Sequence, residues 1–147
     1  MYKRILLAYD GSDSGQKALL DSLDIAQWSH AELYLVAVMP NVSSLVMGSA
    51  ESGVFIDPNN VEEQAKYQAV LDSGFRQLSE AGVSAESKLL VGESVEQITH
   101  YARKVEADLI VVGHKHLDGW AARWWRGSSS PSLIEHAPCS VLVSITQ

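Results

Sequence analysis

The chain has 147 residues, of which 46% are hydrophobic, and its formal net charge is −7. This length fits one domain that buries a core without disulfides or metals, so we assign residues 1–147 to a single domain. The acidic balance argues against a nucleic-acid partner, because binding to phosphate backbones requires a basic surface.

The sequence also predicts a cytoplasmic protein. No apolar run approaches the length that spans a bilayer, and Asp10 ends the first apolar run too soon for the core of a signal peptide. The single cysteine, Cys139, excludes an internal disulfide and is typical of a reducing compartment. Because Cys139 follows Pro138 at the start of a predicted strand, we expect a packed, unreactive thiol.

The first predicted elements are a strand and a helix. Arg4–Tyr9 is apolar and is followed by the turn-forming residues 10–12, as expected of a strand buried on both faces. Ser12 or Asp13 is placed to cap the helix that follows. The apolar residues of this helix recur at helical spacing: Leu19, Leu23 and Ala26.

The middle of the chain predicts a second strand and a long helix. Leu33–Met39 is apolar and β-prone, whereas Asn41–Asn60 carries Ser, Gly, Pro and Asn and is interpreted as an irregular connection. The helix begins near Val61 and ends by Gly82. Its buried face is marked by Leu71, Phe75 and Leu78.

The remaining elements complete an alternating pattern. Further strands are predicted at Ser84–Val91, Asp108–Gly113 and Cys139–Ile145. Ser94 suits the N-cap of a helix with apolar residues at Val95, Ile98, Ala102 and Val105, and Gly127-Ser128 opens a last helix through Leu133 and Ile134. This order predicts a doubly wound, Rossmann-like α/β fold with a five-stranded parallel sheet and helices on both faces. In such sheets ligands bind beyond the carboxyl ends of the strands.

Asp10 is the first polar side chain at such a strand end. Its carboxylate directly follows the first strand, where it is placed to accept hydrogen bonds from a ribose or an adenine amino group. The alternative is that Asp10 only stabilises the turn or the helix start. The residue alone does not distinguish these two roles.

The fourth strand ends in Val112-Gly113-His114-Lys115-His116. Gly113 lacks a Cβ and so allows a ligand to approach the backbone closely. His114 and His116 share a face on an extended path, but two histidines without a third ligand make a poor metal site. We interpret both as solvated loop histidines.

Arg126-Gly127-Ser128-Ser129-Ser130 has the composition of a phosphate-binding segment. Free backbone N–H groups, hydroxyl groups and the positive end of a helix dipole hold phosphate oxygens. A plain serine N-cap is the alternative.

Several segments together resemble the universal stress protein family over nearly the whole chain: Arg4–Asp10, Val111–Gly113, Gly127-Ser128 and His136–Val143. The nucleotide-binding members of that family carry G-x-x-G-x9-G-[ST] after the fourth strand, and their nucleotide lies between the first and fourth strands. Here His116 stands where the middle glycine belongs, and ten residues separate it from Gly127. Because a non-glycine in left-handed backbone costs about 1–2 kcal/mol, we expect this loop to take another path.

The resemblance implies that the protein binds ATP with Mg²⁺. Asp10 and Val38 then bound the adenine end, Gly113 the ribose, and Gly127–Ser130 the phosphates. The candidate nucleotide-binding residues are Ala8, Tyr9, Asp10, Val38, Val112, Gly113, His116, Arg126, Gly127, Ser128, Ser129 and Ser130. The family often has a glycine and a glutamate near the nucleotide at the place of Gly92-Glu93, although a simple helix start explains these residues equally well.

The resemblance also implies a homodimer or higher oligomer through edge pairing of Ser140–Ile145. The segment Trp120–Arg126 either packs on the domain or contributes to an oligomer contact, since aromatic residues and arginines are enriched at interfaces. Relatives accompany transporters, kinases and stress responses, so a membrane transport component is one candidate partner.

Two functions remain open, and an enzyme is disfavoured. The first is a non-enzymatic regulator controlled by ATP occupancy, and the second is a nucleotide-free dimeric interaction module, which the departure at His116 favours. The chain lacks G-x-x-x-x-G-K-[ST] and an evident nucleophile–base pair, so at most slow ATP hydrolysis is expected.

Overall fold

The computed structural model describes residues 1–40, 58–115 and 133–146, and these residues form a single parallel sheet with helices on both faces. The strands are β1 Arg4–Ala8, β2 Glu32–Met39, β3 Ala85–Val91, β4 Leu109–Lys115 and β5 Ser140–Thr146. The helices are α1 Asp13–Ser29, α3 Pro58–Glu80, α4 Ser94–Lys104 and α6 Leu133–His136. The predicted fold class is confirmed.

Strand order places the first strand at the centre of the sheet. The order is β3-β2-β1-β4-β5, and every neighbouring pair is parallel. In β1, Ile5 is paired with Leu33 of β2 on one side and with Leu109 of β4 on the other. The chain therefore winds outward from β1 to β3, crosses back, and winds outward again through β4 to β5.

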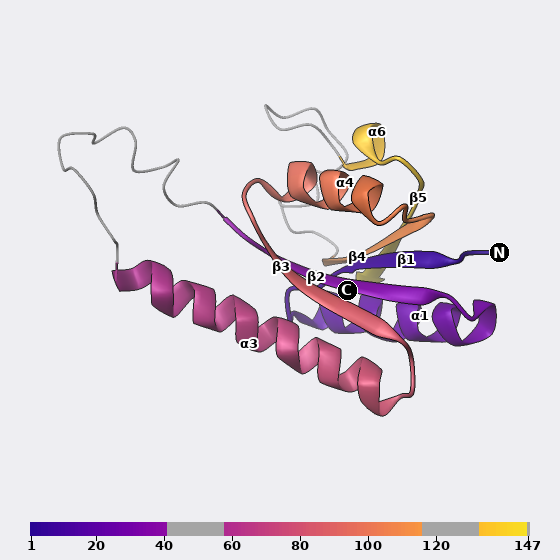
Figure 1. Ribbon diagram of the computed structural model, residues 1–147, viewed down its shortest axis with the longest axis horizontal. Coiled ribbons are helices and arrows are strands. Elements are labelled where there is room, and N and C mark those ends of the chain that lie inside the picture. Colours follow the sequence, from indigo (N-terminus) through magenta and orange to yellow (C-terminus); the bar gives the residue numbers. More distant parts are fainter. Residues whose placement is uncertain (41–57, 116–132, 147) are drawn as a thin grey trace.

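The alternation of side chains along the strands separates two hydrophobic cores. In β1, Ile5 and Leu7 belong to the core that contains the apolar faces of α1 and α3, while Leu6 packs in the core that contains α4 and Leu133. Figure 1 shows α1 and α3 on one side of the sheet and α4 and α6 on the other. The apolar faces predicted for α1, α3 and α4 are the faces that are packed.

Helices α1 and α4 are capped by different kinds of residue at their N-termini. Ser12 caps α1, as one of the two predicted alternatives had it, and its hydroxyl accepts from the Gly15 N–H at 3.1 Å. The prediction that Ser94 caps α4 is wrong, because the cap is Glu93, whose carboxylate accepts from the N–H groups of Val95 and Glu96 at 3.1 and 2.7 Å. A glutamate reaches two amides here, and its charge lies at the positive end of the helix dipole.

Two further boundaries correct the sequence analysis. Helix α3 begins at Pro58, so the last three residues of segment 41–60 are helical and not irregular. Proline is favoured in the first turn of a helix. Strand β4 continues past Gly113 to Lys115, and His114 is only 7% exposed. His114 is therefore a buried strand residue and not a solvated loop histidine. The rest of segment 41–57 and the tryptophan-rich segment 120–126 lie outside the described residues.

Cys139 is half-buried directly before β5. Burial raises the pKa of its thiol, and the charge of Asp108 raises it further. A raised pKa lowers the thiolate fraction, which supports the prediction of an unreactive thiol.

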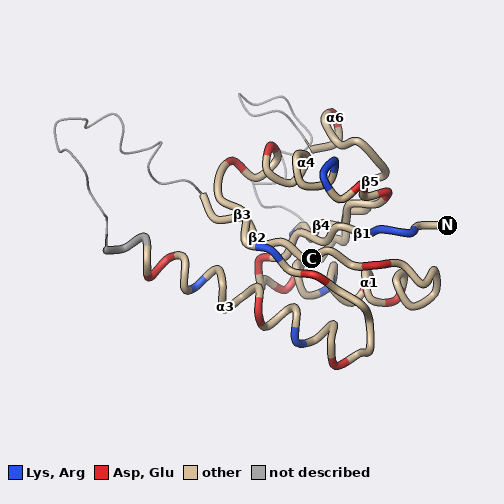
Figure 2. Tube along the Cα trace, viewed as in Figure 1, with Lys and Arg blue, Asp and Glu red and all other residues tan. Residues whose placement is uncertain are grey.

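The charged residues of α1, α3 and α4 are exposed or half-buried. Figure 2 shows Lys and Arg interspersed with Asp and Glu along α1, α3 and α4. Across the described part of the chain, none of the helices is long and apolar enough to cross a membrane.

Candidate ligand-binding site

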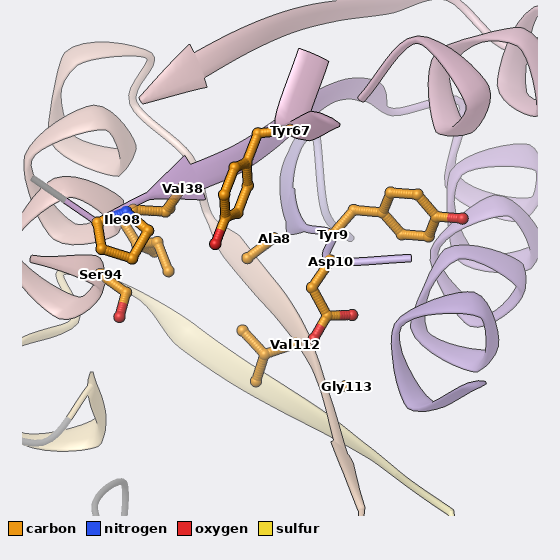
Figure 3. A pocket seen from close by; sticks show the side chains of 10 residues that line it. Ala8, Tyr9, Asp10, Val38, Tyr67, Ser94, Ile98, Val112 and Gly113 are labelled. Atoms are coloured by element: carbon orange, nitrogen blue, oxygen red, sulfur yellow. The ribbon is translucent and has the colours of Figure 1, made fainter. Parts of the chain in front are cut away.

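The sheet reverses its winding between β1 and β4, and a pocket of about 260 Å³ lies at the carboxyl ends of these strands and of β2. A crevice at this reversal point is where open parallel sheets bind their ligands. The pocket is lined by Ala8, Tyr9, Asp10, Val38, Pro40, Tyr67, Ser94, Ile98, Val112 and Gly113. Figure 3 shows most of these side chains around the space.

The structure brings together every predicted site residue that falls in its described part. Ala8, Tyr9 and Asp10 reach the pocket from the end of β1, Val38 from β2, and Val112 and Gly113 from β4. They meet because parallel strands present all their carboxyl ends at one edge of the sheet. The other predicted residues lie outside the described residues: His116, Arg126, Gly127, Ser128, Ser129 and Ser130.

Asp10 has one carboxylate oxygen engaged in the turn after β1. Its Oδ1 accepts from the backbone N–H of Ser12 at 3.0 Å and from the Ser12 hydroxyl at 2.5 Å. Gly11, with φ of 77°, supplies the left-handed backbone that this turn requires. Oδ2 has no hydrogen-bond partner within the described residues, and the side chain is exposed. Asp10 therefore stabilises the turn and still offers an acceptor to the pocket.

Gly113 has a packing role in addition to the predicted close approach of a ligand, which stays a prediction. A Cβ on Gly113 would collide with the backbone carbonyl of Ser14 and lie 2.6 Å from the backbone nitrogen of Gly15. The missing side chain thus allows the start of α1 to pack against β4. A Cβ on Gly15 would in turn meet Oδ1 of Asp10. The two glycines hold the β1 turn, α1 and β4 in close contact beside the pocket.

Tyr9 lines the pocket, although its side chain is directed away from the other lining residues. The ring lies against α3, where a Cβ on Gly74 would be 2.9 Å from Cδ2 and Cε2 of the ring. The hydroxyl donates to Oε1 of Gln16 at 3.0 Å. Figure 3 shows this side chain directed away from Val38 and Tyr67.

Sequence reasoning missed four of the lining residues: Pro40, Tyr67, Ser94 and Ile98. Pro40 directly follows β2, and Ser94 opens α4 after β3, so their positions at strand ends were a usable signal. Ile98 was expected in the core, and it is both buried and part of the pocket wall. Tyr67 lies within a helix, and no sequence signal indicated that α3 reaches the strand ends.

The pocket is mainly apolar, and Asp10 is the only charged residue among the described residues that line it. Such a lining suits an uncharged group with flat apolar faces and a few hydroxyl or amino donors. The described lining contains no Lys or Arg side chain to pair with a phosphate. In the three described stretches of the chain, no three His, Cys, Asp or Glu side chains are grouped so as to hold a metal ion.

The sequence model of the universal stress protein family matches residues 1–144. This chain belongs to the universal stress protein family. A universal stress protein of Methanocaldococcus jannaschii is 32% identical over 143 residues, which cover 97% of this chain and 82% of the relative. A family member from Bacillus subtilis is 30% identical over 149 residues, which cover 97% of this chain and 99% of the relative.

Solved structures of family members share the fold. A family protein from Burkholderia pseudomallei is 27% identical with a TM-score of 0.73, and the match covers 97% of this chain and 95% of that one. A universal stress protein in complex with cAMP is 26% identical with a TM-score of 0.71, and the match covers 99% of this chain and 98% of that one.

Proposed function

We propose that this universal stress protein binds ATP with Mg²⁺ and acts as a non-enzymatic regulator whose oligomeric state or partner binding depends on nucleotide occupancy. We further propose a cytoplasmic location, which the single cysteine supports. A membrane transport component is one candidate for the regulated partner.

One observation carries the nucleotide-binding proposal. The residues predicted from three separate parts of the sequence line the same pocket at the winding reversal of the sheet. Its apolar walls and the available Oδ2 of Asp10 suit a base and a ribose. The family member solved in complex with cAMP, an adenine nucleotide, adds support from a protein of the same fold.

The phosphates need groups that the described lining does not contain. Arg126, Gly127 and the three serines that follow it offer a guanidinium, hydroxyl groups and backbone amides. We therefore assign the phosphates of ATP, with their Mg²⁺, to residues 126–130, and the base and ribose to the described pocket.

Asp10→Asn tests whether the carboxylate accepts a hydrogen bond from the nucleotide. Asparagine keeps an oxygen for the Ser12 contacts but replaces the second acceptor by an NH₂ group. Hydrogen bonds to charged groups are worth about 1.5–3 kcal/mol, so we expect ATP binding to weaken by about tenfold or more in equilibrium dialysis.

Asp13→Asn is the matched control, because Asp13 is an exposed carboxylate in the first turn of α1 that does not line the pocket. Its ATP affinity should stay close to that of the parent protein. Equal ATP affinity in the Asp10→Asn protein and the parent would contradict the assigned role of Asp10. A parent protein that retains and binds no ATP would favour the nucleotide-free interaction module instead.

A further inference from the structure

Tyr67 lines the pocket from α3, and it is not among the residues to which nucleotide binding is assigned above. It belongs to α3, on the same helical stripe as Leu71 and Gly74, which lie four and seven residues further on and are buried against the sheet. Residues at this spacing share one face of a helix. Tyr67 therefore continues the buried face of α3 toward the end of the sheet.

The position of α3 relative to the β1 turn explains why Tyr67 is not itself a core residue. Val70 is the residue of α3 that meets this turn, since a Cβ on Gly11 would lie 3.2 Å from its Cγ1. Tyr67 is three residues earlier, about one helical turn beyond the end of β1. Its ring is half-buried and lines the pocket instead of packing between helix and sheet.

Aliphatic side chains line the pocket near Tyr67, and they form part of its wall. Ile98 of α4 and Val38 of β2 supply this part, and Figure 3 shows Tyr67 reaching into the space beside Val38 with its hydroxyl directed into the pocket. Within the described residues the Tyr67 hydroxyl forms no hydrogen bond. An aromatic ring beside branched aliphatic side chains forms a slot for a flat group, because bases stack favourably on aromatic side chains.

We infer that Tyr67 is a base-contacting residue that stacks on the base of the bound nucleotide and makes the pocket select for the presence of a base. This inference rests on the proposed nucleotide binding and adds a residue to the base end of that site. Asp10 and Val38 bound the same end from β1 and β2, so Tyr67 supplies the wall from α3.

The test compares AMP with ribose 5-phosphate, which lacks the base. Both are measured by competition against labelled AMP, on the parent protein and on Tyr67→Ala, Tyr67→Leu and Tyr67→Phe. Loss of one base–aromatic stack should weaken AMP binding to the Tyr67→Ala protein by about tenfold, which is about 1.4 kcal/mol. Binding of ribose 5-phosphate should change less than about twofold, within roughly 0.4 kcal/mol.

The substitutions separate stacking from other roles of the side chain. Tyr67→Phe keeps the ring and should bind AMP nearly as well as the parent, whereas Tyr67→Leu keeps apolar volume without a flat ring and should resemble Tyr67→Ala. If the Tyr67→Ala protein does not fold, the Tyr67→Leu protein is compared with the parent instead. Gln68→Ala, on the next and exposed position of α3, is the matched control and should leave both ligands unaffected.

The outcomes distinguish this inference from the proposed function. A parent protein that binds no AMP or ATP overturns both. A parent that binds AMP, with equal affinity in Tyr67→Ala and Tyr67→Leu, overturns only the role of Tyr67. Equal losses for AMP and ribose 5-phosphate indicate a structural role, and a loss in Tyr67→Phe as large as in Tyr67→Ala assigns the contact to the hydroxyl; either result overturns stacking.

Discussion

A few atoms at the start of α1 connect the site to the fold. Oδ1 of Asp10 holds the turn through Ser12, Ser12 caps the helix through the Gly15 N–H, and Gly15 leaves room for the carboxylate. Gly113 of β4 lacks a Cβ and so lets the backbone at the start of α1 pack against β4. The orientation of Asp10 toward the pocket therefore depends on the close packing that Gly15 and Gly113 allow.

Gly113→Ala is expected to destabilise the protein by steric conflict. The new Cβ would meet the backbone of Ser14 and Gly15, which moves only if the start of α1 shifts. Overpacking of this kind costs about 1–3 kcal/mol, and we expect a value near the upper end in urea unfolding.

Gly82→Ala provides the comparison for this substitution. Its Cβ would meet no atom within 4 Å, but its φ of +78° is left-handed. Left-handed backbone costs a non-glycine residue about 1–2 kcal/mol, so the loss should be smaller than at Gly113. A larger loss at Gly82 than at Gly113 would contradict the close packing of α1 on β4.

At the level of elements, α4 forms one wall of the pocket and its first turn is set by a single side chain. Glu93 accepts from the amides of Val95 and Glu96, and Ser94 and Ile98 of the same helix line the pocket. The cap therefore stabilises both the helix and the placement of that wall.

Glu93→Ala should lower the free energy of unfolding by about 1 kcal/mol, because loss of an N-cap leaves two amides without their acceptor. Chemical denaturation measures this change. Glu96→Ala removes the same charge from the same turn without removing the cap, and its effect should be smaller. Equal effects of the two substitutions would mean that charge near the helix dipole, and not capping, accounts for the contribution of Glu93.

At the level of the whole molecule, the sheet of the described residues has two edges, β3 and β5. An edge strand presents unpaired backbone groups that can pair with another chain. Ile145 on β5 and Val91 on β3 are similarly exposed, at 46% and 45%. The family resemblance implies a homodimer paired through the β5 edge, and we propose that edge as the interface. Ile145 and Val91 then provide a matched comparison of the two edges.

Ile145→Glu should shift the protein from dimer toward monomer in light scattering. Two symmetry-related strands would bring the new carboxylates close together, and like charges across a strand pair are destabilising. Val91→Glu adds the same charge at the other edge and should leave the mass unchanged. A dimer that survives Ile145→Glu but dissociates in Val91→Glu would move the interface to β3.

The order of elements and the edge of the sheet that carries the site were predictable from the sequence alone. The apolar runs and the helical spacings, such as Leu71, Phe75 and Leu78, are local properties of the chain. Alternation of strands and helices then leads to a parallel sheet, and a parallel sheet places Asp10, Val38 and Gly113 at one edge.

Only the tertiary structure decided which further side chains meet there. Periodicity tells which face of an element is apolar, but it does not tell how far the element extends past its neighbours. Tyr67 lines the pocket because α3 runs beyond the end of β1, and Gly113 is required because α1 packs directly on β4. Both facts depend on distances between segments far apart in the sequence, and packing alone sets those distances.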